Sequence, residues 1–283
     1  MSIFEIYILA FGYIMALMTL VWIASIFLKN ASIVDPFWSI GFVVAGITYY
    51  LNTGGFEPRK IIILTLLIIW GLRLAIYLGW RNIGKPEDYR YQQFRNDYGP
   101  KRYWWFSFFQ VFLLQGVLLW MISIPLLTAM NDTENHSIGI FDYIGIGLWF
   151  IGFAFETVGD YQLARFKSDP ANKGKLLSQG LWKYTRHPNY FGDAVLWWGF
   201  GMFSISVGSY VSILGPLLMS FLIVKVSGVA MLERTLKHTK PAYQDYVRRT
   251  NAFFPWFPKK EKLWDPHRGI GQVKFNRSTK LNN

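Results

Sequence analysis

The 283-residue sequence contains no cysteine and few charged residues. Without cysteine, the chain has no disulfides, thiolate zinc sites, iron–sulfur clusters or thiol nucleophiles. Charged residues make up 16% of the chain, against about 25% in soluble domains. Apolar residues make up 52%, with 13 Trp and 24 Phe, a content that excludes a disordered chain. The net charge is +12, but a soluble nucleic-acid-binding protein would carry such charge without this apolar content, so we expect no nucleic-acid partner.

Long apolar runs dominate what remains. A helix needs about 20 apolar residues to cross a hydrocarbon core of about 30 Å. The sequence therefore predicts an all-α, polytopic membrane protein with about seven membrane helices. The runs are Ile3–Leu28, Phe37–Leu51, Ile61–Trp80, Phe108–Met130, Phe141–Phe166, Ala194–Val207 and Val211–Leu232.

The loops differ in charge, which sets the expected orientation. The segment around Tyr89, the loop Lys167–Pro188 and the C-terminal tail are basic, whereas Asn131–Asp142 holds three acidic residues and no Lys or Arg. Because basic loops stay in the cytoplasm, we expect the N-terminus outside and the C-terminus in the cytoplasm. Arg59 and Lys60 then lie outside, against this rule.

Several ionisable residues fall near the expected cytoplasmic ends of the runs. A charge inside a bilayer is costly, so such residues usually face a polar cavity or a partner. Their common position predicts a polar cavity that opens to the cytoplasm. For Asp35, an alternative is a capping role before the second helix, which Pro36 would suit. They are Asp35, Arg73, Glu156, Asp160 and Asp193.

Two other patterns favour structure over chemistry. Gly145, Gly147 and Gly152 lie on a membrane helix with no preceding strand, so they predict close helix packing and not a dinucleotide-binding loop. The four histidines lack the spacing of metal ligands, and we expect no metal site.

The segment from Gly180 to Asp193 is the most informative. Pro188 biases His187 away from helical geometry, and the residues after it begin the sixth helix. A helix N-terminus attracts anions, and Arg186 stands beside this one. A site for a phosphate-bearing ligand and an anchor at the membrane interface both fit.

Three stretches carry a family resemblance. Arg186–Gly192 resembles the signature of a membrane superfamily that includes steroid 5-alpha-reductases, sterol reductases, isoprenylcysteine carboxyl methyltransferases and phospholipid methyltransferases. Glu233–Pro255 resembles the C-terminal signature of the same group. Ser32–Ser39, together with the basic and aromatic residues between 73 and 91, favours the bacterial branch of steroid 5-alpha-reductase-like proteins.

The resemblance implies an NADPH site facing the cytoplasm. Asn189 would bond the nicotinamide amide, and Asp160 and Lys167 would lie two turns apart on one helix face. Arginine side chains would hold the phosphates. The cofactor-binding residues implied are Arg73, Arg81, Arg90, Tyr91, Glu156, Asp160, Lys167, Arg186, His187, Asn189, Tyr190, Asp193, Glu233, Arg234 and Tyr246.

The steroid enzymes polarise the substrate ketone with a glutamate and a tyrosine. By resemblance, Asp35 takes the place of the acid. The register puts Trp70 at the place of the tyrosine, and Tyr77, one helical repeat further on, becomes the candidate proton donor.

The leading hypothesis is therefore an NADPH-dependent reductase of the carbon–carbon double bond of a lipophilic enone, such as a 3-oxo-4-ene steroid. An S-adenosylmethionine-dependent methyltransferase of a lipid or an isoprenylcysteine is the alternative, and a non-enzymatic scaffold or transporter the third. We expect a monomer in contact with membrane lipids, in a bacterial inner membrane, with its active site facing the cytoplasm.

We expect one catalytic domain over residues 1–262, in which 141–258 carry the signature. Ala242–Arg249 has helical spacing and is expected to form a lid over the cofactor, with Tyr246 facing inward. The polar tail 263–283 is expected to be poorly ordered.

Overall fold

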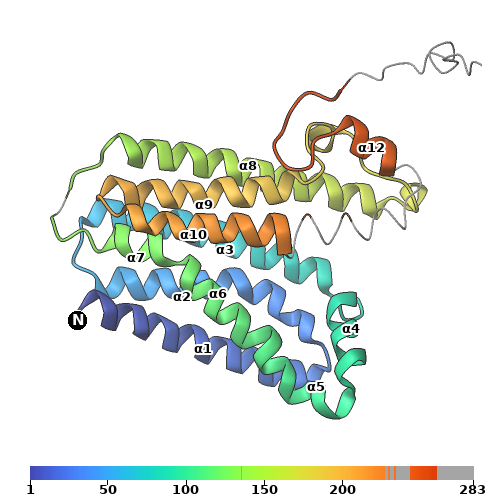
Figure 1. Ribbon diagram of the computed structural model, residues 1–283, viewed down its shortest axis with the longest axis horizontal. Helices are drawn as coiled ribbons and strands as arrows, with labels where there is room; N and C mark the ends of the chain where they lie inside the picture. The colour runs from blue at the N-terminus through green and yellow to red at the C-terminus, as the bar shows by residue number, and fades with distance from the viewer. Residues whose placement is uncertain (135, 227–228, 230–232, 234–242, 260–283) are drawn as a thin grey trace, which may run out of the picture.

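The chain folds into a bundle of long helices that run side by side (Figure 1). The computed structural model describes residues 1–134, 136–226, 229, 233 and 243–259. In these residues, five helical stretches are long and apolar enough to cross a membrane. They are α1 (Ile3–Leu28), Ala31–Asn52 with α2 (Val34–Asn52), α3 (Glu57–Asn82), Lys101–Met130 and α8 (Ile140–Ser168). The predicted all-helical membrane fold is confirmed, because each of the five stretches overlaps one of the predicted apolar runs.

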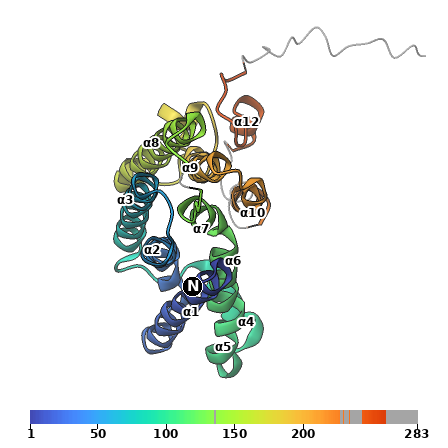
Figure 2. The same ribbon diagram turned by 90° about the vertical axis from the view of Figure 1, so that its left-hand side faces the viewer.

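The fourth stretch is a composite of several helices. After α4 (Tyr89–Tyr98), the chain forms α5 (Pro100–Ser107), a π-helix (Phe108–Leu113), α6 (Leu114–Ile122) and α7 (Ile124–Met130). Proline lacks an N–H and is tolerated in a first helical turn, and Pro125 stands in the first turn of α7, just after Ser123. The break there lets α7 turn inward beneath α9, as the end-on view in Figure 2 shows.

The last two apolar runs form shorter or more buried helices. α9 (Pro188–Ser206) lies between α8 and α10 (Leu214–Phe221) in both views (Figures 1 and 2). The apolar helical stretch Tyr210–Val226 contains α10 and ends in a π-helix, Leu222–Val226; it is shorter than the five candidate spans. Five candidate spans therefore stand against seven predicted runs in the described residues.

Glycines allow α8 and α9 to pack closely. A Cβ atom at Gly145 would lie 2.8 Å from the Gly199 carbonyl oxygen, and one at Gly199 would lie 2.7 Å from the Gly145 carbonyl oxygen. Gly152 faces the backbone of Gly192 in the same way, whereas Gly147 faces open space. The packing interpretation is confirmed for Gly145 and Gly152 and wrong for Gly147. This close approach brings the C-terminal half of α8 against the first turns of α9.

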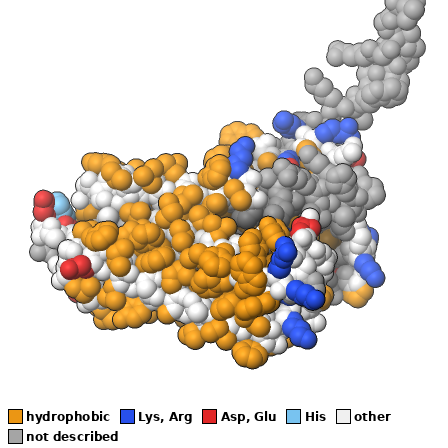
Figure 3. Space-filling model, turned by 60° about the horizontal axis from the view of Figure 1, so that its bottom comes forward, with side chains coloured by type: hydrophobic (Ala, Val, Ile, Leu, Met, Phe, Trp, Pro, Cys, Tyr) orange, Lys and Arg blue, Asp and Glu red, His pale blue; other side chains and the backbone are white. Residues whose placement is uncertain are grey.

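The molecule has an apolar middle and two differently charged ends. Hydrophobic side chains cover the middle in Figure 3, with acidic and histidine side chains at one end and Lys and Arg at the other. At the acidic end Arg59 is fully buried, 2.8 Å from both Asp132 and Asp142, and also bonds the carbonyl oxygens of His136 and Ser137. The acidic loop therefore neutralises the charge of Arg59, which explains why a basic residue is tolerated at the end where the loop-charge rule expects none.

The last helix in the described part of the chain is α12 (Tyr243–Arg249), which lies at the basic end of the bundle (Figure 1). The predicted helix is therefore confirmed from Tyr243 onward. Tyr246 is 6% exposed, and its hydroxyl donates to the Trp182 carbonyl oxygen, so it faces inward as expected. The expectation for the tail 263–283 lies outside the described residues.

Candidate functional site

Arg73 on α3 joins two carboxylates on α8. Its Nη1 atom lies 2.8 Å from Glu156 Oε1, and its Nη2 atom lies 2.6 Å from Asp160 Oδ2. One turn earlier on α3, the indole of Trp70 donates to Glu156 Oε2 at 3.0 Å. Both carboxylates are at least 95% buried as side chains. Helices far apart in the chain are thereby joined by ion pairs inside the bundle.

The first turns of α9 complete this cluster. Asn189 donates from Nδ2 to Asp160 Oδ1 at 3.0 Å, because Gly159 lets the backbone of Asn189 approach α8. Asp193 lies one turn further on, and its Oδ1 atom is buried without a hydrogen-bond partner in the described part of the chain. We call Arg73, Glu156, Asp160, Asn189 and Asp193 the carboxylate cluster.

The carboxylate cluster has more acids than bases. Three carboxylates lie around the guanidinium of Arg73, with Arg81 acting on Asp160 as a second cation, and the charges of Asp160 and Asp193 both act on Glu156. A buried excess of negative charge is costly unless it takes up protons, hydrogen-bond donors or a cation. The cluster is therefore suited to a ligand that donates hydrogen bonds.

A second polar group forms around Asp35. The Tyr91 hydroxyl donates to Asp35 Oδ1 at 2.8 Å, and Arg90 Nη2 lies 3.3 Å from Asp35 Oδ2. Gln115 on α6 donates to the Tyr91 hydroxyl at 3.4 Å. Burial, followed by the negative charge of Asp35, raises the pKa of Tyr91 well above its usual value. Tyr91 is therefore a neutral phenol at physiological pH. We call Asp35, Arg90, Tyr91 and Gln115 the phenol group.

Arg90 and Tyr91, the two residues of the phenol group on α4, are positioned by the first turn of that helix. Asp88 caps the helix by accepting the Arg90 backbone N–H at 3.0 Å, and it accepts the Arg90 side chain at 2.9 Å. Partial burial opposes ionisation of Asp88, but these bonds with Arg90 lower its pKa below the usual value. A charged Asp88 thus holds Arg90 and Tyr91 in place.

Asp35 does not cap α2, so that alternative is wrong. α2 begins at Val34, and Asp35 lies within its first turn. Its carboxylate accepts from Tyr91 and Arg90 instead of from a backbone N–H group. The acid therefore belongs to a contact between α2 and α4.

Tyr77, the sequence-based candidate for the proton donor, lies with the carboxylate cluster. Its hydroxyl is 3.4 Å from the Asp160 carbonyl oxygen, and its ring faces the guanidinium groups of Arg73 and Arg81 at 5.6 and 5.9 Å. The tyrosine that bonds Asp35 is Tyr91, which the sequence assigned to the cofactor. Gln115 was not predicted as a site residue; a polar amide in an apolar run was the signal that could have indicated it.

The two polar groups lie within electrostatic reach of each other. The hydroxyl of Tyr190, in the first turn of α9, is acted on by the charges of Arg81, Arg90, Asp35 and Asp160. Arg81 lies in the last turn of α3. Lys167 lies in the last turn of α8, on the same helix as Asp160. Most of the residues implied by the resemblance thus gather at the basic end of the bundle.

Arg186 and His187 belong to a separate network that holds the C-terminal part. Arg186 donates to Glu233 Oε1 at 2.5 Å and to the carbonyl oxygens of Val247 and Thr250. His187 Nε2 lies 3.4 Å from Glu233. Burial opposes ionisation of Glu233, but the adjacent His187 side chain and the hydrogen bonds from Arg186 lower its pKa to about 2.

This network leaves Arg186 little capacity for a phosphate. The side chain is 7% exposed, and protein groups take its donors. Tyr246, implied at the cofactor, bonds the 182–185 segment. The position of Arg234 lies outside the described residues.

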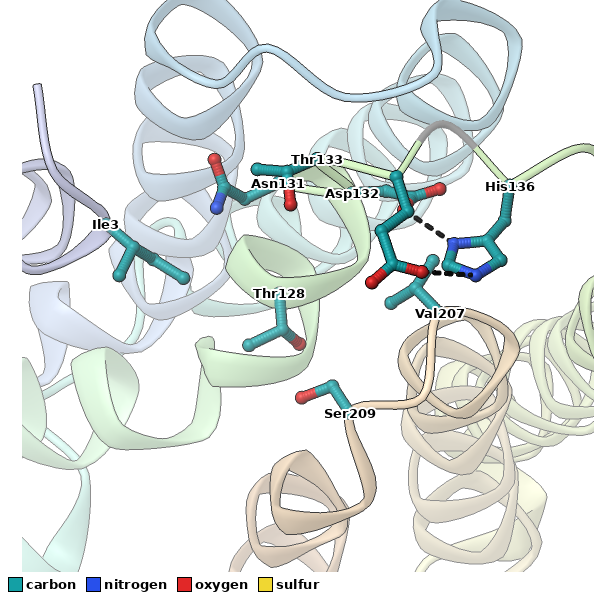
Figure 4. Close-up of a pocket in the computed structure, with 9 residues that line it drawn as sticks. Ile3, Thr128, Asn131, Asp132, Thr133, His136, Val207 and Ser209 are labelled. Carbon is teal, nitrogen blue, oxygen red and sulfur yellow. Dashed lines mark hydrogen bonds and ion pairs between the residues drawn. The ribbon is translucent and has the colours of Figure 1, made fainter.

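The opposite end of the molecule carries a shallow pocket. Asp132, Glu134 and His136 are among its lining residues, and Figure 4 shows Asp132 and His136 close together there. The two ring nitrogens of His136 pair with the carboxylates of Asp132 and Glu134. The hydrogen bond and negative charge of Asp132 raise the pKa of His136. The pocket is lined mostly by loop residues and contains none of the implied site residues, so it is not the candidate site.

The fold and site define a helical membrane protein with two buried polar groups at its basic end. The chain matches the family described as "Protein of unknown function (DUF1295)" over residues 21–250, and it belongs to that family. It is also 26% identical over 261 residues to the "Uncharacterized protein C594.04c" of Schizosaccharomyces pombe. The aligned region covers 83% of this chain and 75% of the yeast protein. No solved structure matches the chain.

Proposed function

We propose that this protein is an NADPH-dependent reductase of the carbon–carbon double bond of a lipophilic enone. The observation that carries the proposal is the buried pair of Tyr91 and Asp35, with a 2.8 Å hydrogen bond between them. The resemblance to steroid 5-alpha-reductase-like proteins supports it, because those enzymes place a tyrosine and an acid at the substrate ketone. Here the pair comes from α4 and α2, in place of the predicted Tyr77.

The phenol group can act as an acid on a carbonyl. As an enone is reduced, its carbonyl oxygen gains negative charge, and a positioned donor lowers that barrier. The raised pKa of Tyr91 keeps its proton on the oxygen until a stronger base forms. Arg90, 3.3 Å from Asp35, offsets the negative charge beside the phenol. Tyr91 would donate its proton to the enolate oxygen.

The carboxylate cluster fits the amide end of a nicotinamide. The buried, unpartnered Oδ1 atom of Asp193 is an acceptor that a carboxamide N–H group would satisfy. Asn189 and Asp160 would hold the same amide, and Arg81 and Arg90 would meet the phosphates. The hydride for the β-carbon of the enone would come from bound NADPH. Arg186 would instead keep the loop before α9 in place.

The basic end of the bundle favours a site that faces the cytoplasm, by the loop-charge rule. We propose this orientation, with a lipophilic substrate that enters from the bilayer. A 3-oxo-4-ene steroid is the probe that represents this class.

One observation favours the alternative, a methyltransferase. S-adenosylmethionine carries positive charge, and the carboxylate cluster has three acids against one Arg73. The charge excess would suit such a cation as well as it suits an amide. Arg186 and Glu233 lie in signatures that both enzyme classes share, so they do not separate the two.

Ligand protection separates the two functions. The full chain in lipid nanodiscs is heated with NADPH or with S-adenosylmethionine. A ligand at 100 times its Kd stabilises the folded state by about 2.7 kcal/mol. We expect protection by NADPH, and oxidation of NADPH when a 3-oxo-4-ene steroid is added. Protection by S-adenosylmethionine alone would assign the protein to the methyltransferases, and protection by neither would leave the scaffold.

A further inference from the structure

The segment 253–259, which follows α12, exposes three large aromatic side chains. Phe254, Trp256 and Phe257 are 72%, 69% and 74% exposed. We call residues 253–259 the aromatic segment. It lies outside the five candidate spans, so the crossing of a bilayer by a helix does not account for its exposed rings. Clustered aromatic side chains on a surface mark a site of interaction.

Hydrogen bonds fix the backbone of the aromatic segment, and they therefore hold its three rings at the surface. The backbone N–H of Trp256 donates to the Tyr184 carbonyl oxygen at 3.0 Å, and the backbone N–H of Lys259 donates to the Arg249 carbonyl oxygen at 2.9 Å. The Thr185 hydroxyl donates to the Phe253 carbonyl oxygen at 2.7 Å. These bonds hold both ends of the segment and its centre against the protein.

An aromatic path connects the segment to the outer surface of the bundle. Phe155 on α8 contacts Phe191 on α9 with ring centroids 5.1 Å apart, and Phe191 contacts Phe254 at 6.1 Å. Phe253 also contacts Phe191, with ring centroids 5.8 Å apart, so the segment packs on the first turn of α9, which itself lies against α8. The exposed rings therefore extend the apolar surface of a candidate membrane span.

Basic side chains flank the rings. Lys183 and Lys259 are exposed, and the Arg248 side chain is 76% exposed beside Asp245. Exposed Trp and Phe together with Lys and Arg are the composition of segments that lie in the interface of a membrane. Basic groups near the surface attract anionic headgroups.

We propose that the aromatic segment is an interfacial anchor that inserts Phe254, Trp256 and Phe257 into the headgroup layer of a bilayer containing anionic phospholipid. The partner is the lipid surface itself. Because the segment bonds Tyr184 and Thr185, the anchor also ties the loop before α9 to the membrane. This proposal does not depend on the reaction proposed above.

The absence of cysteine permits a direct test on the full chain. Phe257→Cys creates a unique site for an environment-sensitive fluorophore, and Lys175→Cys, on an exposed loop, is the matched control. Both variants are reconstituted in phosphatidylcholine vesicles with and without phosphatidylglycerol. Acrylamide reports access from water, and lipids with a nitroxide near the headgroup or deep in the chain report depth.

We expect the label at position 257 to be quenched several-fold more by the shallow nitroxide than by the deep one, and to be shielded from acrylamide. Phosphatidylglycerol should strengthen this quenching, and Lys259→Glu should remove the increase. The control label should respond to acrylamide alone. The proposal is overturned if position 257 behaves like the control, if the deep nitroxide quenches it more, if anionic lipid has no effect, or if the label is shielded from both quenchers by a second copy.

Discussion

Replacing Tyr91 by phenylalanine tests the phenol group most directly. The change deletes one oxygen and leaves the ring, which packs in the core with 5% exposure. It removes the 2.8 Å hydrogen bond to Asp35, and Arg90 at 3.3 Å remains as the other partner of that carboxylate. Gln115 also loses the acceptor that it bonds at 3.4 Å.

The expected loss of stability follows from these contacts. A buried group that loses its hydrogen-bond partner costs about 1–3 kcal/mol. Tyr103→Phe is the matched control, because the Tyr103 hydroxyl is also buried but has no hydrogen-bond partner among the described residues. Its ring contact with Arg95, 4.8 Å from the centroid, survives the change. We therefore expect Tyr91→Phe to lower the free energy of unfolding and Tyr103→Phe to leave it nearly unchanged.

The effect on the reaction should exceed the effect on folding. Loss of a general acid slows a reaction by about 10²–10⁴-fold, so single-turnover oxidation of NADPH with a 3-oxo-4-ene steroid should slow by that factor in Tyr91→Phe. NADPH affinity should stay unchanged. A rate within about twofold of the wild type would refute the assigned role of Tyr91, and equal losses of stability in both variants would refute the hydrogen-bond argument.

Three further predictions concern other parts of the molecule. Asn189→Ala should weaken NADPH binding by about 1–3 kcal/mol, measured by titration, while Asn52→Ala at the other end should not; equal affinities would place the cofactor elsewhere. Arg59→Gln should lower the free energy of unfolding by about 3–5 kcal/mol, because it strands two buried carboxylates; chemical unfolding beside the exposed Arg102→Gln measures the difference, and a loss no larger than the control's contradicts it. Glu233 has a folded-state pKa of about 2, below its ordinary 4.5, so its stabilising contribution is full above pH 4.5 and is lost as the pH falls towards 2. The difference in the free energy of unfolding between wild type and Glu233→Gln should therefore shrink over that pH range. A constant difference would show that the ionised form of Glu233 does not stabilise the fold.

The amino-acid sequence was sufficient to predict an all-helical membrane fold, although it predicted seven spans where the described residues contain five candidates. Apolar runs of about 20 residues permit little else in a bilayer, since each backbone group needs an internal partner. The bounds of α1 (Ile3–Leu28) agree with the first run, and Pro188 marked the start of α9. The sequence also predicted that Asp35, Arg73, Glu156, Asp160 and Asp193 lie in polar surroundings inside the bundle, because a charge among apolar residues is conspicuous.

What the sequence could not predict was the pairing of these residues. Asp35 lies 56 positions from Tyr91, and Arg73 lies 87 from Asp160. Helical periodicity orders residues only along one helix, so the register taken from the resemblance pointed to Trp70 and, one helical repeat further on, to Tyr77 as the proton donor. The placement of α4 beside α2 selected Tyr91 instead. Likewise, nothing in the sequence explained Arg59 at the end expected outside, whereas the structure pairs it with Asp132 and Asp142.

The sequence by itself therefore determined the membrane class, the bounds of α1 and the approximate places of the long helices, because these depend on local composition and on the length of apolar runs. Only the tertiary structure decided that Tyr91, and not Tyr77, meets Asp35, and that Arg186 serves Glu233. Each of these contacts joins elements distant in the chain. Their distances depend on how closely the helices pack, which glycines such as Gly145 and Gly152 allow between α8 and α9.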